Sequence, residues 1–234
     1  MNDLFCWESK YKTCIYSESL INKIYFQNET SNNKVELLQI KKAIYYAKKY
    51  HGSQKRLSGE LYYTHPLAVA ELVAPYCFKT DILVTSILHD TIEDTELTKD
   101  LIAYIFDSNI ASKVDDLTRV KFDRKISVPE ILELLWLQKK NDLLLVKFFD
   151  RVHNMQTIEV KSKEKIIKST EETLKTFTSL AMFLQAIIHE EFPIDETLML
   201  LCLQALRFNK QMPQESLKVF EDNFQLPSLI SQNE

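Results

Sequence analysis

The sequence contains only two glycines, Gly52 and Gly59, and six prolines among its 234 residues. Because these two residue types most often interrupt regular structure, their scarcity favours long helices over many short elements. Long segments carry apolar residues with a period near 3.6, which is the spacing of amphipathic helices. We therefore predict an all-α fold in which the two glycines flank one segment, residues 51–66.

Other absences limit the classes of function. No stretch approaches 18 consecutive apolar residues, and the polar start does not resemble a signal peptide, so we expect no membrane span. The formal net charge of -4 provides no broad basic field, so nucleic acid is not an expected partner. The cysteines are scattered, without close pairs, which fits a reduced cytoplasm. They are Cys6, Cys14, Cys77 and Cys202.

The apolar pattern divides the chain into helices and three regions. Predicted helices cover about 35–50, 66–76, 80–93, 96–106, 108–118, 128–139, 142–158, 161–191, 198–208 and 215–224. A polar break at 28–33 leaves residues 1–33 as an N-terminal appendage. Residues 34–160 form the predicted core, and residues 161–234 a C-terminal helical extension. That extension either packs on the core or forms a subunit interface of a homo-oligomer.

The stretch SILHDTIEDT, residues 86–95, follows a nearly apolar run but carries one histidine and three acids. On a helix, residues three and four apart share a face. His89 would then lie over Glu93, and Asp90 over both Glu93 and Asp94. Burying this much charge is costly unless a cation compensates it, so the stretch predicts a metal site.

Two further residues complete a predicted ligand set. His65 precedes a proline at a predicted helix start, and Asp150 ends the apolar run LLLVKFFD much as Asp90 ends DILVTSILHD. Taken singly, His65 could cap a helix and Asp150 could pair with a neighbouring lysine. Together with His89 and Asp90 they offer two imidazoles and two carboxylates, a set that suits a divalent ion such as manganese better than structural zinc.

Three motifs in order resemble the hydrolase domain of the RelA/SpoT-homologue alarmone enzymes, a branch of the HD-domain metal phosphohydrolases. They are RxSGExYxxHP at 56–66, HDTIEDT at 89–95 and DRVHNMQT at 150–157. The resemblance runs from about residue 35 to 160. It implies an HD-domain helical bundle that removes the 3′-pyrophosphate from (p)ppGpp, giving GDP or GTP, with manganese as cofactor. The length of the chain suggests a stand-alone small alarmone hydrolase.

The resemblance also implies roles for individual residues. The metal ligands would be His65, His89, Asp90 and Asp150. The acidic pair that orients or deprotonates the attacking water would be Glu93 and Asp94. The loop that holds the guanine would contribute Arg56 and Ser58, and the nucleoside pocket Asn154 and Thr157.

Some positions depart from the family's pattern. Leu61 replaces a proline, Phe149 replaces a small residue before the aspartate, and Gln156 replaces an arginine. None of them is a predicted ligand, so they bear on substrate and rate rather than on metal binding. Two alternatives therefore stay open, which are a phosphohydrolase of another nucleotide and a non-catalytic nucleotide sensor.

Overall fold

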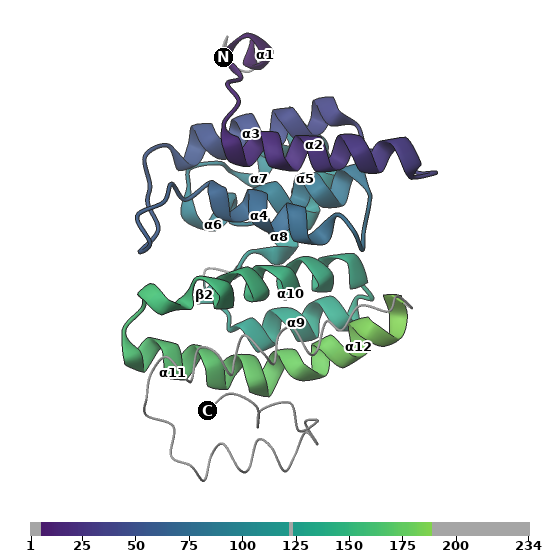
Figure 1. Cartoon of the computed structure of the whole chain (residues 1–234). Helices are drawn as coiled ribbons and strands as arrows, with labels where there is room; N and C mark the ends of the chain where they lie inside the picture. Colours follow the sequence, from purple (N-terminus) through teal and green to yellow (C-terminus); the bar gives the residue numbers. More distant parts are fainter. Residues whose placement is uncertain (1–5, 122–123, 189–234) are drawn as a thin grey trace, which may run out of the picture.

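The computed structural model describes residues 6–121 and 124–188, and these residues form helices almost throughout (Figure 1). The predicted all-α fold is confirmed. The first helices are α1 (Trp7–Lys10), α2 (Ile15–Thr30), α3 (Leu37–His51), α4 (Thr64–Val73), α5 (Thr80–Leu88), α6 (Thr91–Asp94), α7 (Lys99–Ile105) and α8 (Ser108–Leu117). The later ones are α9 (Val128–Leu137), α10 (Asn141–Gln156), η2 (Ile158–Val160), α11 (Lys163–Glu172), η3 (Thr173–Phe177) and α12 (Thr178–Ile188). A two-residue antiparallel pair, β1 (Val120–Lys121) with β2 (Arg124–Lys125), interrupts the series.

Helix α5 lies at the centre of the first half of the fold. Every residue from Ile82 to Leu88 is buried, and the helix packs against α3, α4 and α8. A helix that is apolar on all sides gains most when neighbours cover it completely, which explains this position. Its C-terminal end therefore delivers the residues that follow it into the interior.

Helix α10 occupies the equivalent position in the second half. It packs against α4, α9 and α12 (Figure 1), and its residues 143–149 are all buried. Phe148 and Phe149 belong to the hydrophobic core, and the Phe149 ring stacks on Tyr76 with 5.1 Å between centroids. These bulky side chains therefore fill the space between helices on the side of α10 that faces away from solvent.

The N-terminal segment differs from the expected appendage. In the described part of residues 1–33, helix α2 packs on α3 and α4, and Leu20 and Ile24 are fully buried in the main core. The side chain of Asn28 accepts a hydrogen bond from the backbone of Val35 and donates one back. This segment is thus continuous with the core. The sequence did not predict α2 because its apolar periodicity is weak. Leu20 and Ile24 are its only fully buried apolar residues.

The C-terminal half of the described chain also continues the core across residue 160. Helices α11 and α12 join through the π-helical turn η3, where the sequence predicted one helix over 161–191. Phe177, Leu180 and Leu184 are buried in the same core as α5 and α10. The helices predicted at 198–208 and 215–224 lie outside the described residues. Within the described part, no helix is both long and apolar enough to cross a membrane.

Candidate metal centre and nucleotide site

His65 lies in the first turn of α4, shortly after the loop over 52–63 that contains both glycines. The loop is closed by a single bridge between Lys55 and Leu61, and the His65 amide donates to the Tyr62 carbonyl at 3.1 Å. The sequence placed Pro66 at the first helical position, but α4 begins two residues earlier, at Thr64. Pro66 still falls in the first turn, where its missing N–H removes no helical hydrogen bond.

His89 and Asp90 lie at a break that the sequence did not predict. The expected helix over 80–93 stops at Leu88 and resumes at Thr91, whose hydroxyl donates to the Leu88 carbonyl at 2.7 Å. His89 and Asp90 keep right-handed helical dihedral angles but belong to neither helix. The one continuous helix that the sequence predicted over 80–93 is therefore wrong.

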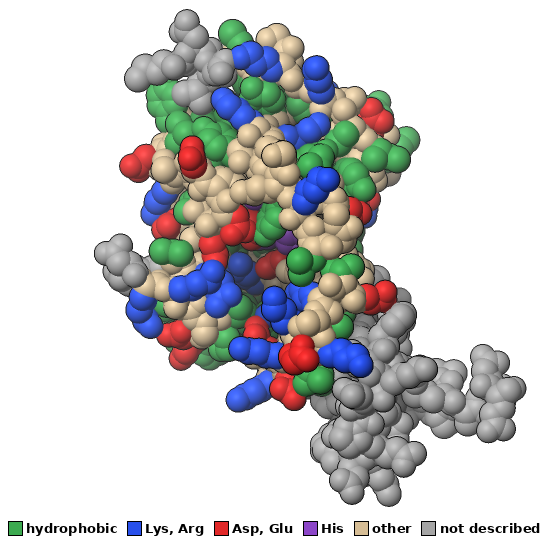
Figure 2. Space-filling view, turned by 90° about the vertical axis from the view of Figure 1, so that its left-hand side faces the viewer, with side chains coloured by type: hydrophobic (Ala, Val, Ile, Leu, Met, Phe, Trp, Pro, Cys, Tyr) green, Lys and Arg blue, Asp and Glu red, His purple; other side chains and the backbone are tan. Residues whose placement is uncertain are grey.

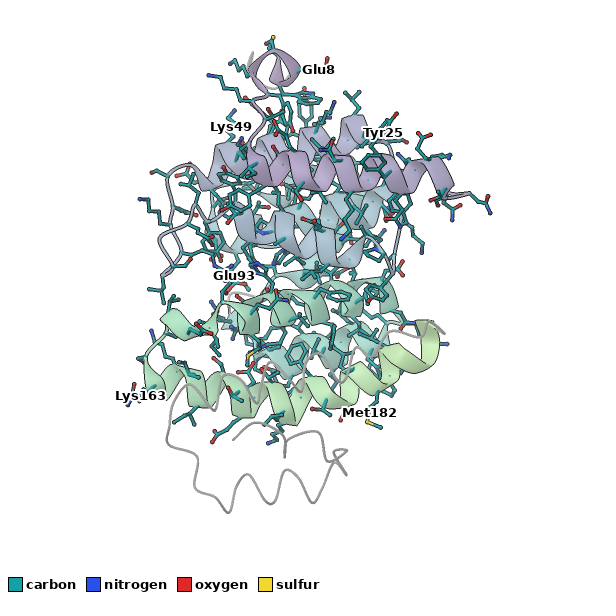
Figure 3. All side chains as sticks on the ribbon, viewed as in Figure 1. Glu8, Tyr25, Lys49, Glu93, Lys163 and Met182 are labelled. Carbon is teal, nitrogen blue, oxygen red and sulfur yellow. The ribbon has the colours of Figure 1, made fainter. Side chains whose placement is uncertain are left out.

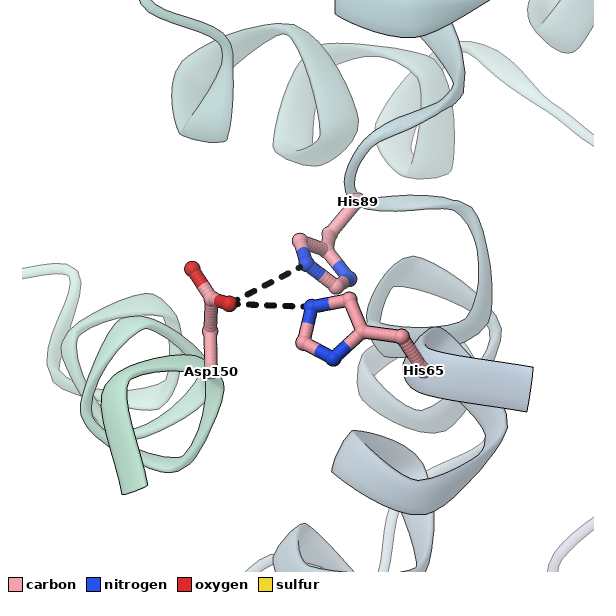
Figure 4. A group of neighbouring side chains, drawn as sticks. All are labelled: His65, His89 and Asp150. Carbon is pink, nitrogen blue, oxygen red and sulfur yellow. Dashed lines mark hydrogen bonds and ion pairs between the residues drawn. The ribbon is translucent and has the colours of Figure 1, made fainter. Parts of the chain in front are cut away.

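Asp150 of α10 meets both histidines (Figure 4). Its Oδ1 lies 3.1 Å from Nε2 of His65 and 3.8 Å from Nε2 of His89. Ligand atoms from these three residues all lie within 4.8 Å of one another. An ion that holds its ligands at about 2.1 Å spaces them at most about 4 Å apart, so this group is close to the required size.

Asp90 joins the same group. Its Oδ1 lies 3.0 Å from Nε2 of His89, and its Oδ2 lies 3.6 Å from Nε2 of His65. The structure thus brings all four predicted ligand residues together. The Nδ1 of His89 lies 2.8 Å from the Ser86 carbonyl, which can only accept, so Nδ1 carries a proton. Nε2 of His89 is buried and faces the carboxylates of Asp90 and Asp150 without hydrogen-bond geometry to either, as expected of an atom placed to bind a metal ion.

The charges of this cluster depend strongly on one another. Burial alone would lower the pKa of His89, but the carboxylates of Asp90 and Asp150 outweigh it and raise the pKa to about 10. Despite burial, His89 lowers the pKa of Asp90 to about 2, and His65 and His89 hold the pKa of Asp150 well below its usual range. Two ionised carboxylates in the interior require a cation, which is either a proton on imidazole or a metal ion.

The two acids that follow the break point in different directions. Glu93 Oε1 lies 2.6 Å from Nζ of Lys125, and Glu93 Oε2 accepts from the Arg119 amide at 3.2 Å (Figure 3). Asp94 Oδ2 accepts instead from the Tyr62 hydroxyl at 2.8 Å. Burial and the neighbouring charges of Asp90 and Glu93 raise the pKa of Asp94, against the opposing hydrogen bond from Tyr62. Glu93 is therefore held by cationic and N–H groups, whereas Asp94 binds a proton more readily than an ordinary aspartate.

Arg56 connects the glycine-flanked loop to α10. Its Nη2 donates to Oδ1 of Asn154 at 2.9 Å and to Oγ1 of Thr157 at 3.2 Å. Asn154 in turn donates from Nδ2 to Oδ1 of Asp150 at 2.7 Å. Three of the four predicted nucleotide-binding residues are thus in direct contact beside the metal cluster. Ser58 is exposed in the loop and donates to Glu60 at 3.4 Å instead.

The surface around these residues is recessed. Figure 2 shows histidine and acidic side chains inside the recess and lysine and arginine side chains along its lower side. A cavity of about 640 Å³ opens beside Asp94 and is lined by Lys49, Tyr50, Gln54 and residues 93–96. The cavity thus borders the acidic pair Glu93 and Asp94, and none of its lining residues is a predicted metal ligand.

A family model described as an HD domain matches residues 43–185, a range that contains every residue of the site described above. The chain belongs to the HD domain family. The match also extends past residue 160 and includes α11 and most of α12. The HD domain thus takes in part of the expected C-terminal extension, in agreement with the continuous core.

Several curated proteins are similar in sequence to this chain. Proteins called GTP pyrophosphokinase rsh from Brucella ovis and Brucella abortus are 38% identical over 148 residues, covering 61% of this chain and 20% of theirs. A GTP pyrophosphokinase of Myxococcus xanthus is 38% identical over 151 residues, covering the same shares of both chains. These matches confirm the resemblance to the RelA/SpoT homologues. The chain spans about a fifth of the length of these relatives.

A solved structure also resembles the HD domain. It is described as a metazoan ortholog of SpoT that hydrolyzes ppGpp, and it superposes with a TM-score of 0.53. The match covers 71% of this chain and 94% of that one at 16% sequence identity. Identity at this level shows a shared fold, which agrees with the predicted HD-domain bundle.

Two further residues of the HD domain contact the site, and neither was assigned a role in the sequence analysis above. His153 lies one turn after Asp150, with its Nδ1 2.8 Å from Nδ1 of His65. Tyr62 lies three residues before His65 and contacts Asp94. Their spacing of three residues from a predicted ligand was the available signal.

Proposed function

We propose that this HD domain is a divalent-metal-dependent hydrolase that removes the 3′-pyrophosphate from (p)ppGpp to give GDP or GTP and pyrophosphate. The observation that carries the proposal is the convergence of two imidazoles and two carboxylates from α4, the break between α5 and α6, and α10 on one point. The cofactor would be Mn²⁺, because a mixed nitrogen and oxygen set without thiolates suits that ion. The relatives named above and the ppGpp-hydrolysing neighbour support a guanine alarmone as substrate.

The residues that would hold the ion are His65, His89, Asp90 and Asp150. When bound, the divalent ion supplies a Lewis acid that polarises a phosphoryl oxygen and makes water a better nucleophile at neutral pH. The two carboxylates balance its charge, and the nearly complete burial of both histidine rings keeps competing water away from them.

Asp94 is the better candidate for accepting the proton of the attacking water. Its raised pKa makes it a stronger base than an ordinary carboxylate, and the Tyr62 hydroxyl fixes one of its oxygens. Glu93 would act by position, since Lys125 and the Arg119 amide already hold both of its oxygens. The proton taken from water would finally reach the ribose 3′ oxygen as its bond to phosphorus breaks.

The nucleotide would lie against the loop that carries Arg56 and Ser58. The flat guanidinium of Arg56 can stack on a purine while it keeps its hydrogen bonds to Asn154 and Thr157. Both of these residues belong to the last turn or C-cap of α10, one turn or two after Asp150. A base held there would therefore lie close to the residues proposed to bind the ion.

The test is to incubate the purified chain with Mn²⁺ and ppGpp, pppGpp or other nucleotide phosphates, and to resolve the products by anion-exchange chromatography. We expect GDP and pyrophosphate from ppGpp, and no product after chelation of the metal. Release of phosphate from a different nucleotide alone would assign another phosphohydrolase. Tight binding of nucleotide without product at any metal concentration would identify a non-catalytic sensor.

A further inference from the structure

Three side chains form a row behind the proposed metal site. Nδ1 of His153 lies 3.1 Å from Nη1 of Arg56 and 2.8 Å from Nδ1 of His65. An arginine guanidinium carries hydrogen on every nitrogen and can only donate. Nδ1 of His153 must therefore be the acceptor in the contact with Arg56, which means that this nitrogen carries a lone pair.

This assignment determines the proton on His65. Because Nδ1 of His153 has no hydrogen, Nδ1 of His65 must be the donor in the 2.8 Å contact between the two rings. The other nitrogen of His65, Nε2, is then the atom directed at the carboxylates of Asp150 and Asp90, at 3.1 and 3.6 Å. It is therefore the nitrogen of His65 that is left to bind a metal ion.

In both His65 and His89, Nδ1 donates a hydrogen bond and Nε2 faces the carboxylates. The group that accepts the hydrogen bond differs between the two. His89 is fixed by a main-chain carbonyl, that of Ser86, which no side-chain substitution removes. His65 is fixed by a side chain, His153, and that side chain is half-buried between His65 and Arg56. Only one of the two histidines thus depends on an outer residue that can be exchanged.

We infer that His153 is a positioning residue that fixes the tautomer and ring orientation of His65 for cation binding, and that Arg56 keeps His153 in its accepting form. The inference rests on the metal site of the proposed function. Outer partners of this kind raise the affinity of a metal site about 10-fold to 100-fold, because they hold a ligand ring in place and increase its basicity.

The experiment compares two substitutions at position 153 in the full chain. His153→Asn places an amide oxygen where Nδ1 of the imidazole stood, so it retains an acceptor for Arg56 and His65. His153→Leu fills similar space without an acceptor. Affinity for Mn²⁺ is measured from the free-ion signal in electron paramagnetic resonance, and thermal unfolding in the presence of chelator shows whether each variant folds.

We expect His153→Leu to bind Mn²⁺ at least about 10-fold more weakly than the wild-type chain, and His153→Asn to remain within about 3-fold of it. Equal affinities for all three proteins, or equal losses in both variants while they unfold at the wild-type temperature, would overturn the inference. Wild-type protein that binds Mn²⁺ but releases no product would refute the proposed hydrolysis and leave the inference standing. A wild-type chain that binds no Mn²⁺ would overturn both.

Discussion

Binding of a divalent ion to the cluster should release protons, and the number can be measured. His89 carries a proton at neutral pH in the metal-free protein, because Asp90 and Asp150 raise its pKa from 6.5 to about 10. That rise corresponds to roughly 5 kcal/mol in favour of the protonated ring, as the net of the attraction to the carboxylates and the opposing cost of burial. A raised pKa stabilises the metal-free fold fully below pH 6.5, and the stabilisation is lost as pH rises through about 10.

A metal ion needs the lone pair of Nε2 in His89, so it must displace that proton. At a pH of about 8, at least one proton should leave for each Mn²⁺ bound. The apparent affinity for Mn²⁺ should increase about tenfold for each pH unit over the range in which His89 stays protonated.

Isothermal titration of the chain with Mn²⁺ in buffers of different ionisation enthalpy measures the proton count directly. The slope of the observed binding enthalpy against the ionisation enthalpy of the buffer is negative, and its magnitude equals the number of protons released. His153→Asn is the matched control, since it retains His89 and its carboxylates and should give the same slope. Tight binding with a slope of zero would refute the electrostatic account of the cluster.

Three substitutions test the other roles. Asp150→Asn should lower Mn²⁺ affinity and hydrolysis together by at least about 100-fold, because it leaves the two histidines with one carboxylate. Full activity in a metal-free sample would contradict the proposal that Asp150 binds a metal ion needed for hydrolysis. Tyr62→Phe removes the hydrogen bond that lowers the pKa of Asp94, so that pKa should rise further. The acid limb of the pH–rate profile should then move to higher pH, while Mn²⁺ affinity stays the same. An unmoved limb would exclude Asp94 as the base. Glu93→Gln should retain Mn²⁺ and slow turnover about 100-fold, and a parallel loss of metal would instead make Glu93 a ligand.

The sequence predicted the composition of the site better than its geometry. The order of three motifs placed His65, His89, Asp90 and Asp150 in one group, and the structure brings them together. The helical-face argument for residues 86–95 failed, because it assumed an unbroken helix. Hydrogen bonding by Thr91 to Leu88 and burial at the end of α5 favour the break, and neither follows from apolar periodicity.

Contacts between distant segments explain what could not be predicted. Lys125 meets Glu93 through a short strand pair that carries no strong local signal, and Arg56 meets His153 across 97 positions of sequence. Helix α2 was missed for a related reason. Its buried face consists of a few residues, and their burial depends on packing against α3 and α4 rather than on local pattern.

The hydrogen bonds of Arg56 have a consequence for how nucleotide affinity should be understood. The loop over 52–63 contains no helix, and the guanidinium of Arg56 joins it to Asn154 and Thr157. The proposed binding surface is thus held by contacts within the protein, and a purine bound there would lose little free energy in ordering it. Substitutions on α10 would then weaken affinity largely by releasing the loop, so their effects would exceed the value of any direct contact with the base.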